Sequence, residues 1–255
     1  PAMSGLGGDG FYHVWLAGSA KTLVYNGTGT APKAAVKGEI FSKGIPVMGP
    51  HSVSVPGMVG GLGAMHKDYG TKSWQSLCDR AACLAGGGFF VTHAYRSFAK
   101  QASEKIQLNE VSQEIFLNKS ASPDIGTKIK QSKLCRTLTQ LGDEGPDGFY
   151  RGKLANKIVK DARVAGSLLS NSDFAEFYPE VQDSIAIKYR DFEIFQTPPN
   201  STGFVMLQEL KIFENFDISE MNFNDPELIH LMVEAKKHAF LDRERFGGDP
   251  RLIEV

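Results

Sequence analysis

Cysteine is scarce in this sequence of 255 residues, and its three copies form no recognisable pair. They stand at positions 78, 83 and 135, so no Cys-x-x-Cys motif occurs, which argues against zinc ribbons and dithiol redox centres. An odd number also leaves at least one thiol unpaired. Sparse, odd cysteine favours a reducing compartment. We therefore expect a cytoplasmic protein, with the periplasm as the alternative.

An excess of charge of one sign and long apolar runs are also missing. The chain has 28 Lys and Arg against 29 Asp and Glu, a formal net charge of −1. Such a balance builds no field for nucleic acid or for an anionic membrane surface. No run of 18 apolar residues is present, so we expect no membrane partner and no nucleic-acid partner. Hydrophobic residues at 42% and charged residues at 22% indicate a globular protein.

Local patterns predict a mixture of helices and strands. Short runs rich in aromatic and β-branched residues predict strands, and apolar residues at helical spacing predict helices. The expected strands are 11–16 and 21–25, forming a hairpin, and 185–189 and 192–195. The expected helices are 58–69, 73–85, 94–108, 134–141, 154–165 and 204–213, with a last helix from about 226 that ends at Gly247. Glycines at 60, 61 and 63 predict a close backbone neighbour.

Three motifs resemble functional sites but lack the context that those sites need. GLGGDG at 5–10 matches the dinucleotide fingerprint, yet a strand follows it where a helix is required. Ser97 and Lys100 form an SxxK without its partner motifs. His230, Glu234 and His238 share a helical face without an HExxH arrangement, which favours a solvated strip. We therefore expect no metal and no organic cofactor, and the residues by themselves offer no complete catalytic apparatus.

Five segments in order resemble the large subunit of the γ-glutamyltranspeptidase family. They are PAMSGLGGDGFYHVW (1–15), VPGMVGGLGAMHKDYGTKSWQSL (55–77), DEGPDGFYRGKLANKIVKDARVAGSLLSNSDFAEF (143–177), YRDFEIFQTPPNSTGFVMLQEL (189–210) and HLMVEAKKHAFLDRERFGGDP (230–250). The resemblance implies an α+β fold, the αββα sandwich of N-terminal-nucleophile hydrolases. It implies that residues 1–255 form a single domain, most of a large subunit, which a small subunit from the same proenzyme completes.

The resemblance also implies a mechanism and partners. The proenzyme would cleave itself before a Thr, and the α-amino group of that Thr would serve as the base. The catalytic Thr would then lie on the small subunit, and no catalytic residue would lie in this chain. The implied substrate is a small-molecule amide or γ-glutamyl compound, as in glutathione metabolism. A dimer of heterodimers is a further expectation.

One departure from the family pattern bears on the substrate. The transpeptidases carry an Arg-Glu-Thr-Ala-Pro loop whose Arg binds the α-carboxylate of the γ-glutamyl group. Here Thr28, Gly29 and Thr30 stand in register with Arg, Glu and Thr, and no Arg precedes Arg80. A neutral side chain does not replace a bidentate Arg. We therefore expect residues 28–30 to line the acyl pocket, and the departure argues against a γ-glutamyl substrate. Cephalosporin or glutaryl acylases, small-amide hydrolases and a non-catalytic scaffold remain alternatives.

Overall fold

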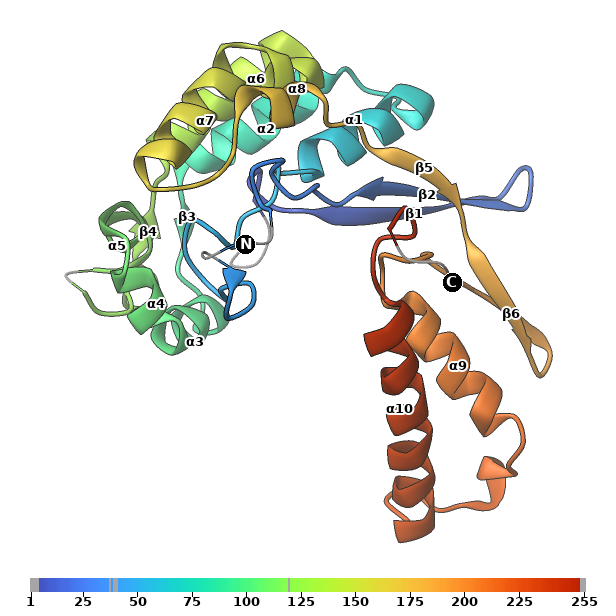
Figure 1. The fold of residues 1–255 in the computed structure, drawn as a ribbon. Coiled ribbons are helices and arrows are strands. Elements are labelled where there is room, and N and C mark those ends of the chain that lie inside the picture. Colours follow the sequence, from blue (N-terminus) through green and yellow to red (C-terminus); the bar gives the residue numbers. More distant parts are fainter. Residues whose placement is uncertain (1–4, 37, 39–40, 119, 253–255) are drawn as a thin grey trace. The chain divides into compact units, whose positions relative to one another are not determined.

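The computed structural model describes residues 5–36, 38, 41–118 and 120–252, and it forms two compact units (Figure 1). The first unit contains the N-terminal segment up to Asp9 and Gly27–Tyr178. The second contains Gly10–Asn26 and the chain from Pro179 onward. The expected single domain over 1–255 stays a prediction. The first four residues of the segment 1–15 lie outside the described residues.

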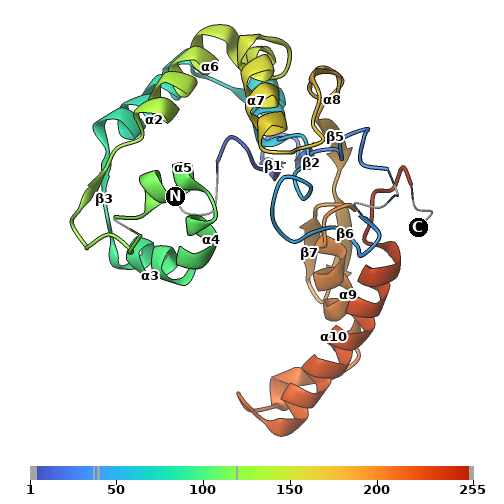
Figure 2. The same ribbon diagram turned by 60° about the vertical axis from the view of Figure 1, so that its left-hand side comes forward.

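The first unit is mainly helical. Helices α2, α6 and α7 lie side by side in both views (Figures 1 and 2). Its elements are α1 (Met58–Tyr69), α2 (Trp74–Gly87), β3 (Phe89–Phe90), α3 (His93–Gln101), α4 (Ser103–Gln107), α5 (Glu110–Phe116), β4 (Lys128–Ile129), α6 (Ser132–Arg151), α7 (Lys153–Val164) and α8 (Asn171–Ala175). Helix α2 begins where its cap was predicted, because the Ser73 side chain accepts a hydrogen bond from the Ser76 N–H at 3.2 Å.

The core of this unit is aromatic and is centred on the end of α6. Phe149, Tyr150, Phe174 and Phe177 are buried, and the rings of Tyr150 and Phe177 stack with centroids 5.1 Å apart. The Tyr150 hydroxyl donates to the Pro56 carbonyl and accepts from the Gly60 N–H, both at 2.8 Å. These two bonds fasten the start of α1 to the core, and the one from the Gly60 N–H satisfies a donor that a helix start leaves unpaired.

Of the glycines in α1, Gly63 faces a close neighbour, but it is a side chain. A Cβ at Gly63 would lie 2.7 Å from the ring of Pro146 on α6. At this position a proline ring therefore takes the place of the expected backbone neighbour. Helix α2 packs on α6 in the same way, because a Cβ at Gly142 would lie 3.1 Å from the Cβ of Cys78.

Two helix predictions in this unit differ from the structure in their extent. The helix expected at 134–141 is present as the first segment of α6, but α6 resumes after an interruption at Gly145, where φ is +72°, and continues to Arg151. The Gly145-Pro146 pair ends one helical segment and begins the next, since proline is favoured in a first turn. The single helix expected at 94–108 is divided into α3 and α4 at Ala102.

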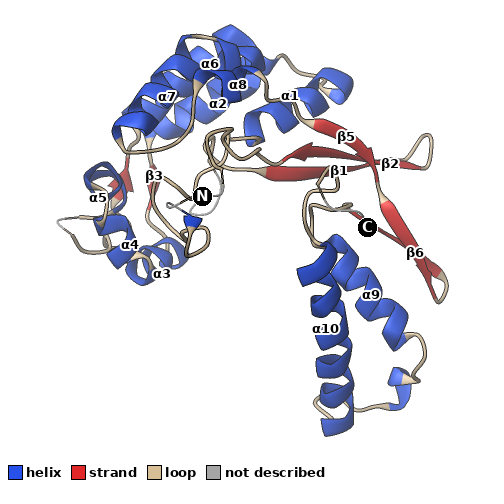
Figure 3. Ribbon diagram, in the orientation of Figure 1, coloured by secondary structure: helices blue, strands red, loops and turns tan. Residues whose placement is uncertain are grey.

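The second unit combines two small sheets with two helices (Figure 3). Strands β1 (Gly10–Leu16) and β2 (Lys21–Gly27) form the predicted hairpin, and β5 (Glu180–Asp183) pairs antiparallel with β2, with Asn26 opposite Glu180. Strands β6 (Ile185–Tyr189) and β7 (Phe192–Gln196) were both predicted, and they pair antiparallel as a second hairpin. Helices α9 (Gly203–Phe213) and α10 (Pro226–Phe246) pack together, and α10 ends at Gly247 as expected. None of the helices in the described ranges combines the length and hydropathy that a bilayer-spanning segment needs.

Candidate functional site

Residues 28–30 lie on one loop after β2, and the Asp9 carboxylate holds that loop. Asp9 Oδ1 accepts the Gly29 N–H at 3.0 Å and the Gly57 N–H at 3.1 Å. Asp9 Oδ2 accepts the Ser54 hydroxyl at 3.3 Å. One carboxylate therefore joins the loop to the segment that leads into α1.

The loop and the segment 54–57 are in backbone contact. The Val55 N–H donates to the Thr30 carbonyl at 3.0 Å. A Cβ built at Gly29 would lie 1.7 Å from the Val55 carbonyl oxygen, and one at Gly57 would lie 2.2 Å from the Gly27 carbonyl oxygen. Neither position can carry a side chain without moving the backbone. Gly29 is thus required by packing at the place where the transpeptidase pattern has Glu.

The nearest cation in sequence, Lys33, is engaged elsewhere. Its ammonium forms an ion pair with Glu176, and its backbone N–H donates to Asp173 Oδ1 at 2.9 Å. Asp173 lies in α8 and Glu176 is the residue that follows it, so Lys33 joins the chain after residues 28–30 to α8. The ion pair is exposed and by itself stabilises little.

Asp173, which accepts the Lys33 N–H, is buried, with 5% of its surface exposed. Its Oδ2 accepts the Ser170 N–H at 2.8 Å and the Ser170 hydroxyl at 2.6 Å, completing a capping box at the start of α8. Burial raises the pKa of the Asp173 carboxyl, but the hydrogen bonds from Ser170 and from the Lys33 N–H outweigh it, so the pKa is lowered. The carboxylate is therefore the stable form beside the loop.

Sequence reasoning missed both carboxylates. The Ser170-x-x-Asp173 spacing is a capping-box pattern and could have indicated Asp173. Asp9 follows a glycine run, and nothing in its own surroundings signals a contact 20 or 48 residues away.

A second polar cluster lies in the second unit, at the end of β2. Asn26 is buried, and its Nδ2 donates to Asn200 Oδ1 at 3.0 Å. Asn200 belongs to the segment TPPNS, in which the Gly203 N–H donates to the Ser201 hydroxyl at 3.0 Å at the start of α9. These bonds fix the chain between β7 and α9.

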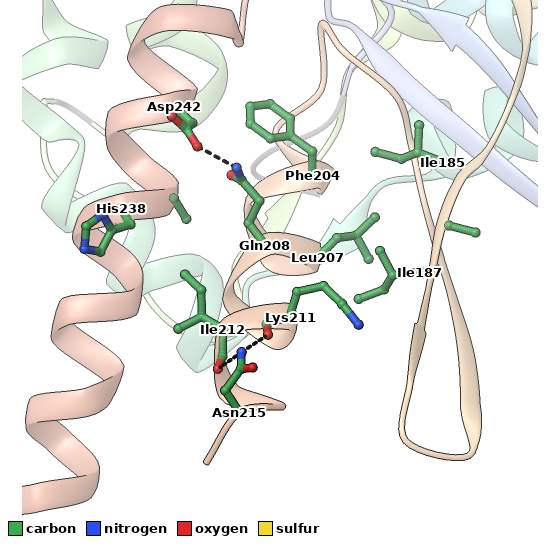
Figure 4. Close-up of a pocket in the computed structure, with 12 residues that line it drawn as sticks. Ile185, Ile187, Phe204, Leu207, Gln208, Lys211, Ile212, Asn215, His238 and Asp242 are labelled. Carbon is green, nitrogen blue, oxygen red and sulfur yellow. Dashed lines mark hydrogen bonds between the residues drawn. The ribbon is translucent and has the colours of Figure 1, made fainter.

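The second unit also contains a hollow of about 470 Å³ between the β6–β7 hairpin, α9 and α10 (Figure 4). Aliphatic side chains dominate its lining, and Gln208 Nε2 donates to Asp242 Oδ2 at 2.7 Å within it. No nucleophile paired with a base lines this hollow. Its surface suits packing against protein rather than chemistry.

The His230, Glu234 and His238 face of α10 forms no metal site. Glu234 Oε1 accepts the Lys237 ammonium at 2.6 Å, and that hydrogen bond is the main cause that lowers the pKa of the carboxyl. In the part of the chain that the structure describes, no group of three His, Cys, Asp or Glu side chains is placed to hold a metal ion.

Comparison with known proteins gives consistent matches. The sequence pattern of the gamma-glutamyltranspeptidases matches residues 1–255. The chain is 32% identical over 257 residues to a glutathione hydrolase-like proenzyme, YwrD, of Bacillus subtilis, covering 100% of this chain and 49% of that protein. The gamma-glutamyltranspeptidase of Helicobacter pylori has a TM-score of 0.93 at 30% identity, covering 100% of this chain and 75% of that one.

An acylase is structurally similar as well. The cephalosporin acylase of Bacillus halodurans has a TM-score of 0.89 at 28% identity, covering 99% of this chain and 48% of that one. The chain spans about half the length of the curated relatives it matches, 49% and 45% for the first two. The α+β architecture is that of N-terminal-nucleophile hydrolases, as the family resemblance implied. The chain belongs to the gamma-glutamyltranspeptidase family.

Proposed function

We propose that this chain is the large subunit of an amide hydrolase or acyltransferase that forms by self-cleavage. Its nucleophile would be the N-terminal Thr of a small subunit, with the Thr α-amino group as base. The curated relatives are proenzymes, which supports a cleaved precursor. Residues 28–30 would form one wall of the acyl pocket, held by Asp9 on one side and Asp173 on the other.

The structure of the loop carries the proposal about the substrate. Thr28 replaces the Arg of the transpeptidase pattern, and the backbone contact at Gly29 leaves no room for the neighbouring Glu. An acyl group with a carboxylate at its far end would bury that charge without its guanidinium partner. A charge-assisted hydrogen bond is typically worth about 1.5–3 kcal/mol. The γ-glutamyl and glutaryl groups both carry this carboxylate, so we propose an acyl group that lacks it.

This assignment differs from the activity of the acylase relative. The Bacillus halodurans protein is a cephalosporin acylase, and such a reaction is the alternative among amide hydrolyses. A small-amide hydrolase fits the neutral loop better than a cephalosporin acylase does. Thr28 occupies the position of the missing Arg, and none of the cationic residues among the first 79 positions aligns with it.

Arginine at position 28 should shift the enzyme toward carboxylate-bearing substrates. In the full-length protein, Thr28→Arg should raise kcat/KM for γ-glutamyl and glutaryl anilides about 10- to 100-fold relative to butanoyl anilide, since 1.4 kcal/mol is a factor of ten. The unmodified protein should favour butanoyl anilide over the γ-glutamyl and glutaryl anilides. Gel electrophoresis should show two fragments for both proteins.

Two results would contradict the proposal. Efficient γ-glutamyl turnover by the unmodified protein would mean that another cation binds the carboxylate. Absence of both self-cleavage and amide hydrolysis would favour the non-catalytic scaffold.

The small subunit would cover apolar surface of the second unit. Helices α9 and α10 expose several large apolar side chains, namely Met206, Ile229, Met232, Val233, Phe240 and Leu241. Exposed large apolar side chains that gather on neighbouring helices are typical of an interface. The same two helices line the open hollow of Figure 4, which suits a packed protein partner.

Residues 1–255 expressed alone should therefore be poorly folded. We expect self-association, binding of a hydrophobic dye and no cooperative thermal transition, because the apolar surface has no cover. The full-length protein is the control and should melt cooperatively. A soluble monomer of residues 1–255 that melts cooperatively would contradict the proposed interface.

A further inference from the structure

Asp9 carries a negative charge at the proposed acyl pocket that no ion pair neutralises among the described residues. Its carboxylate is exposed and accepts three hydrogen bonds, from Gly29, Gly57 and Ser54, all of them neutral donors. The charge is thus held next to Thr28 and Gly29 by the backbone itself.

The carboxylate also keeps acceptor capacity. An ionised carboxylate offers about four lone-pair sites. Oδ1 accepts two backbone N–H groups, whereas Oδ2 accepts only the Ser54 hydroxyl, at the longer distance of 3.3 Å. Oδ2 can therefore accept one further donor from the solvent side. An ammonium group is the donor that gains most from an ionised acceptor.

We propose that Asp9 determines specificity in this enzyme: its charge selects acyl donors that carry an ammonium group and no carboxylate at the end of the acyl chain. The inference rests on the proposed function and names the substrate class of the same site. Asp9 also positions the loop through the Gly29 and Gly57 N–H groups. The loss of the Arg at position 28 and the presence of Asp9 then act in the same direction, since both disfavour an anionic acyl group.

Four anilides separate the two charges of the γ-glutamyl group. The γ-glutamyl group has an ammonium and a carboxylate, glutaryl has the carboxylate alone, 4-aminobutanoyl has the ammonium alone, and butanoyl has neither. For the full-length protein we expect kcat/KM to be highest for 4-aminobutanoyl anilide. It should exceed the value for butanoyl anilide about tenfold or more, as expected for a charge-assisted hydrogen bond.

Two substitutions of Asp9 separate its charge from its positioning role. Asp9→Asn keeps an oxygen acceptor for Gly29 and Gly57 and removes the charge. It should lower the ratio of 4-aminobutanoyl to butanoyl turnover about tenfold, mainly through the KM for the 4-aminobutanoyl substrate. Asp9→Ala removes the acceptor as well and should lower turnover of both substrates. Asp161→Asn, an exposed carboxylate on α7, is the matched control and should change neither.

The outcomes distinguish this inference from the function on which it rests. If the unmodified protein neither cleaves itself nor hydrolyses any of the four anilides, the proposed function and this inference both fail. If it hydrolyses butanoyl anilide, and Asp9→Asn leaves the 4-aminobutanoyl to butanoyl ratio unchanged, the function stands and the specificity role of Asp9 is wrong. A lowered ratio with a retained melting temperature supports the inference.

Discussion

Gly29→Ala should destabilise the protein by about 2–4 kcal/mol and impair the proposed pocket. A Cβ at this position would lie 1.7 Å from the Val55 carbonyl oxygen, and backbone cannot move aside as a flexible side chain can. Relief of the clash separates the loop from segment 54–57 and weakens the Gly29–Asp9 and Val55–Thr30 hydrogen bonds. Overpacking costs about 1–3 kcal/mol, and each lost hydrogen bond adds about 1 kcal/mol. Urea unfolding of the full-length protein measures the loss.

The matched control for this substitution is Gly7→Ala. Gly7 lies two residues before Asp9 and is exposed, and a Cβ there would meet nothing within 4 Å. Its effect should stay within about 0.5 kcal/mol, as for other surface changes. Equal urea midpoints for the two variants would show that the loop adapts to a side chain, and the packing argument for Gly29 would fail.

The sequence predicted most elements of the fold because their ends carry local signals. Ser73 caps α2, Gly70 follows α1 and Gly247 ends α10, and each signal depends only on residues within one turn. The β1–β2 hairpin and the strands β6 and β7 were likewise indicated by short apolar runs around turn residues. Elements of this kind can be read from a single sequence, since the physics that decides them is local.

Elements stabilised by distant partners were not predicted. Strand β5 is short and polar, with the sequence EVQD, and exists because it pairs with β2 across more than 150 residues. The second segment of α6, from Pro146 to Arg151, was not predicted, because it is short and its Phe149 and Tyr150 are held in the core by residues distant in sequence. Propensity is overridden in both places by contacts that the local sequence does not contain.

The candidate site shows the same division. The family pattern indicated residues 28–30, and the structure places them on one loop. Asp9 and Asp173, which hold this loop, could not be identified as its supports. Their hydrogen bonds reach Gly29 across 20 residues and Lys33 across 140 residues. Alignment with the family pattern thus indicates the loop, whereas the residues that fix its shape are known only from the fold.

Asp173→Ala should destabilise the protein by about 3–5 kcal/mol. The substitution removes the acceptor for the Ser170 hydroxyl and for the backbone N–H groups of Ser170 and Lys33. Each buried group left without a partner costs about 1–3 kcal/mol. The capping box at α8 is lost at the same time. Asp161→Ala removes an exposed carboxylate from α7 and is the matched control, with an expected effect within about 0.5 kcal/mol.

The contribution of Asp173 should also depend on pH, in a direction that its environment fixes. The pKa of its carboxyl is lowered in the folded protein, although burial opposes this, because Ser170 and Lys33 donate hydrogen bonds to the ionised form. A lowered pKa stabilises the folded state at pH values above the unfolded pKa of about 3.9, and this stabilisation is lost as the pH falls through the folded pKa.

Asp173→Asn removes the titrating group and keeps one oxygen acceptor. The difference in unfolding free energy between the unmodified protein and Asp173→Asn should therefore be constant from about pH 7 to 5 and should shrink below about pH 4. Urea unfolding of both proteins across this range measures it, and a difference that grows on acidification would mean that burial rather than hydrogen bonding dominates at Asp173.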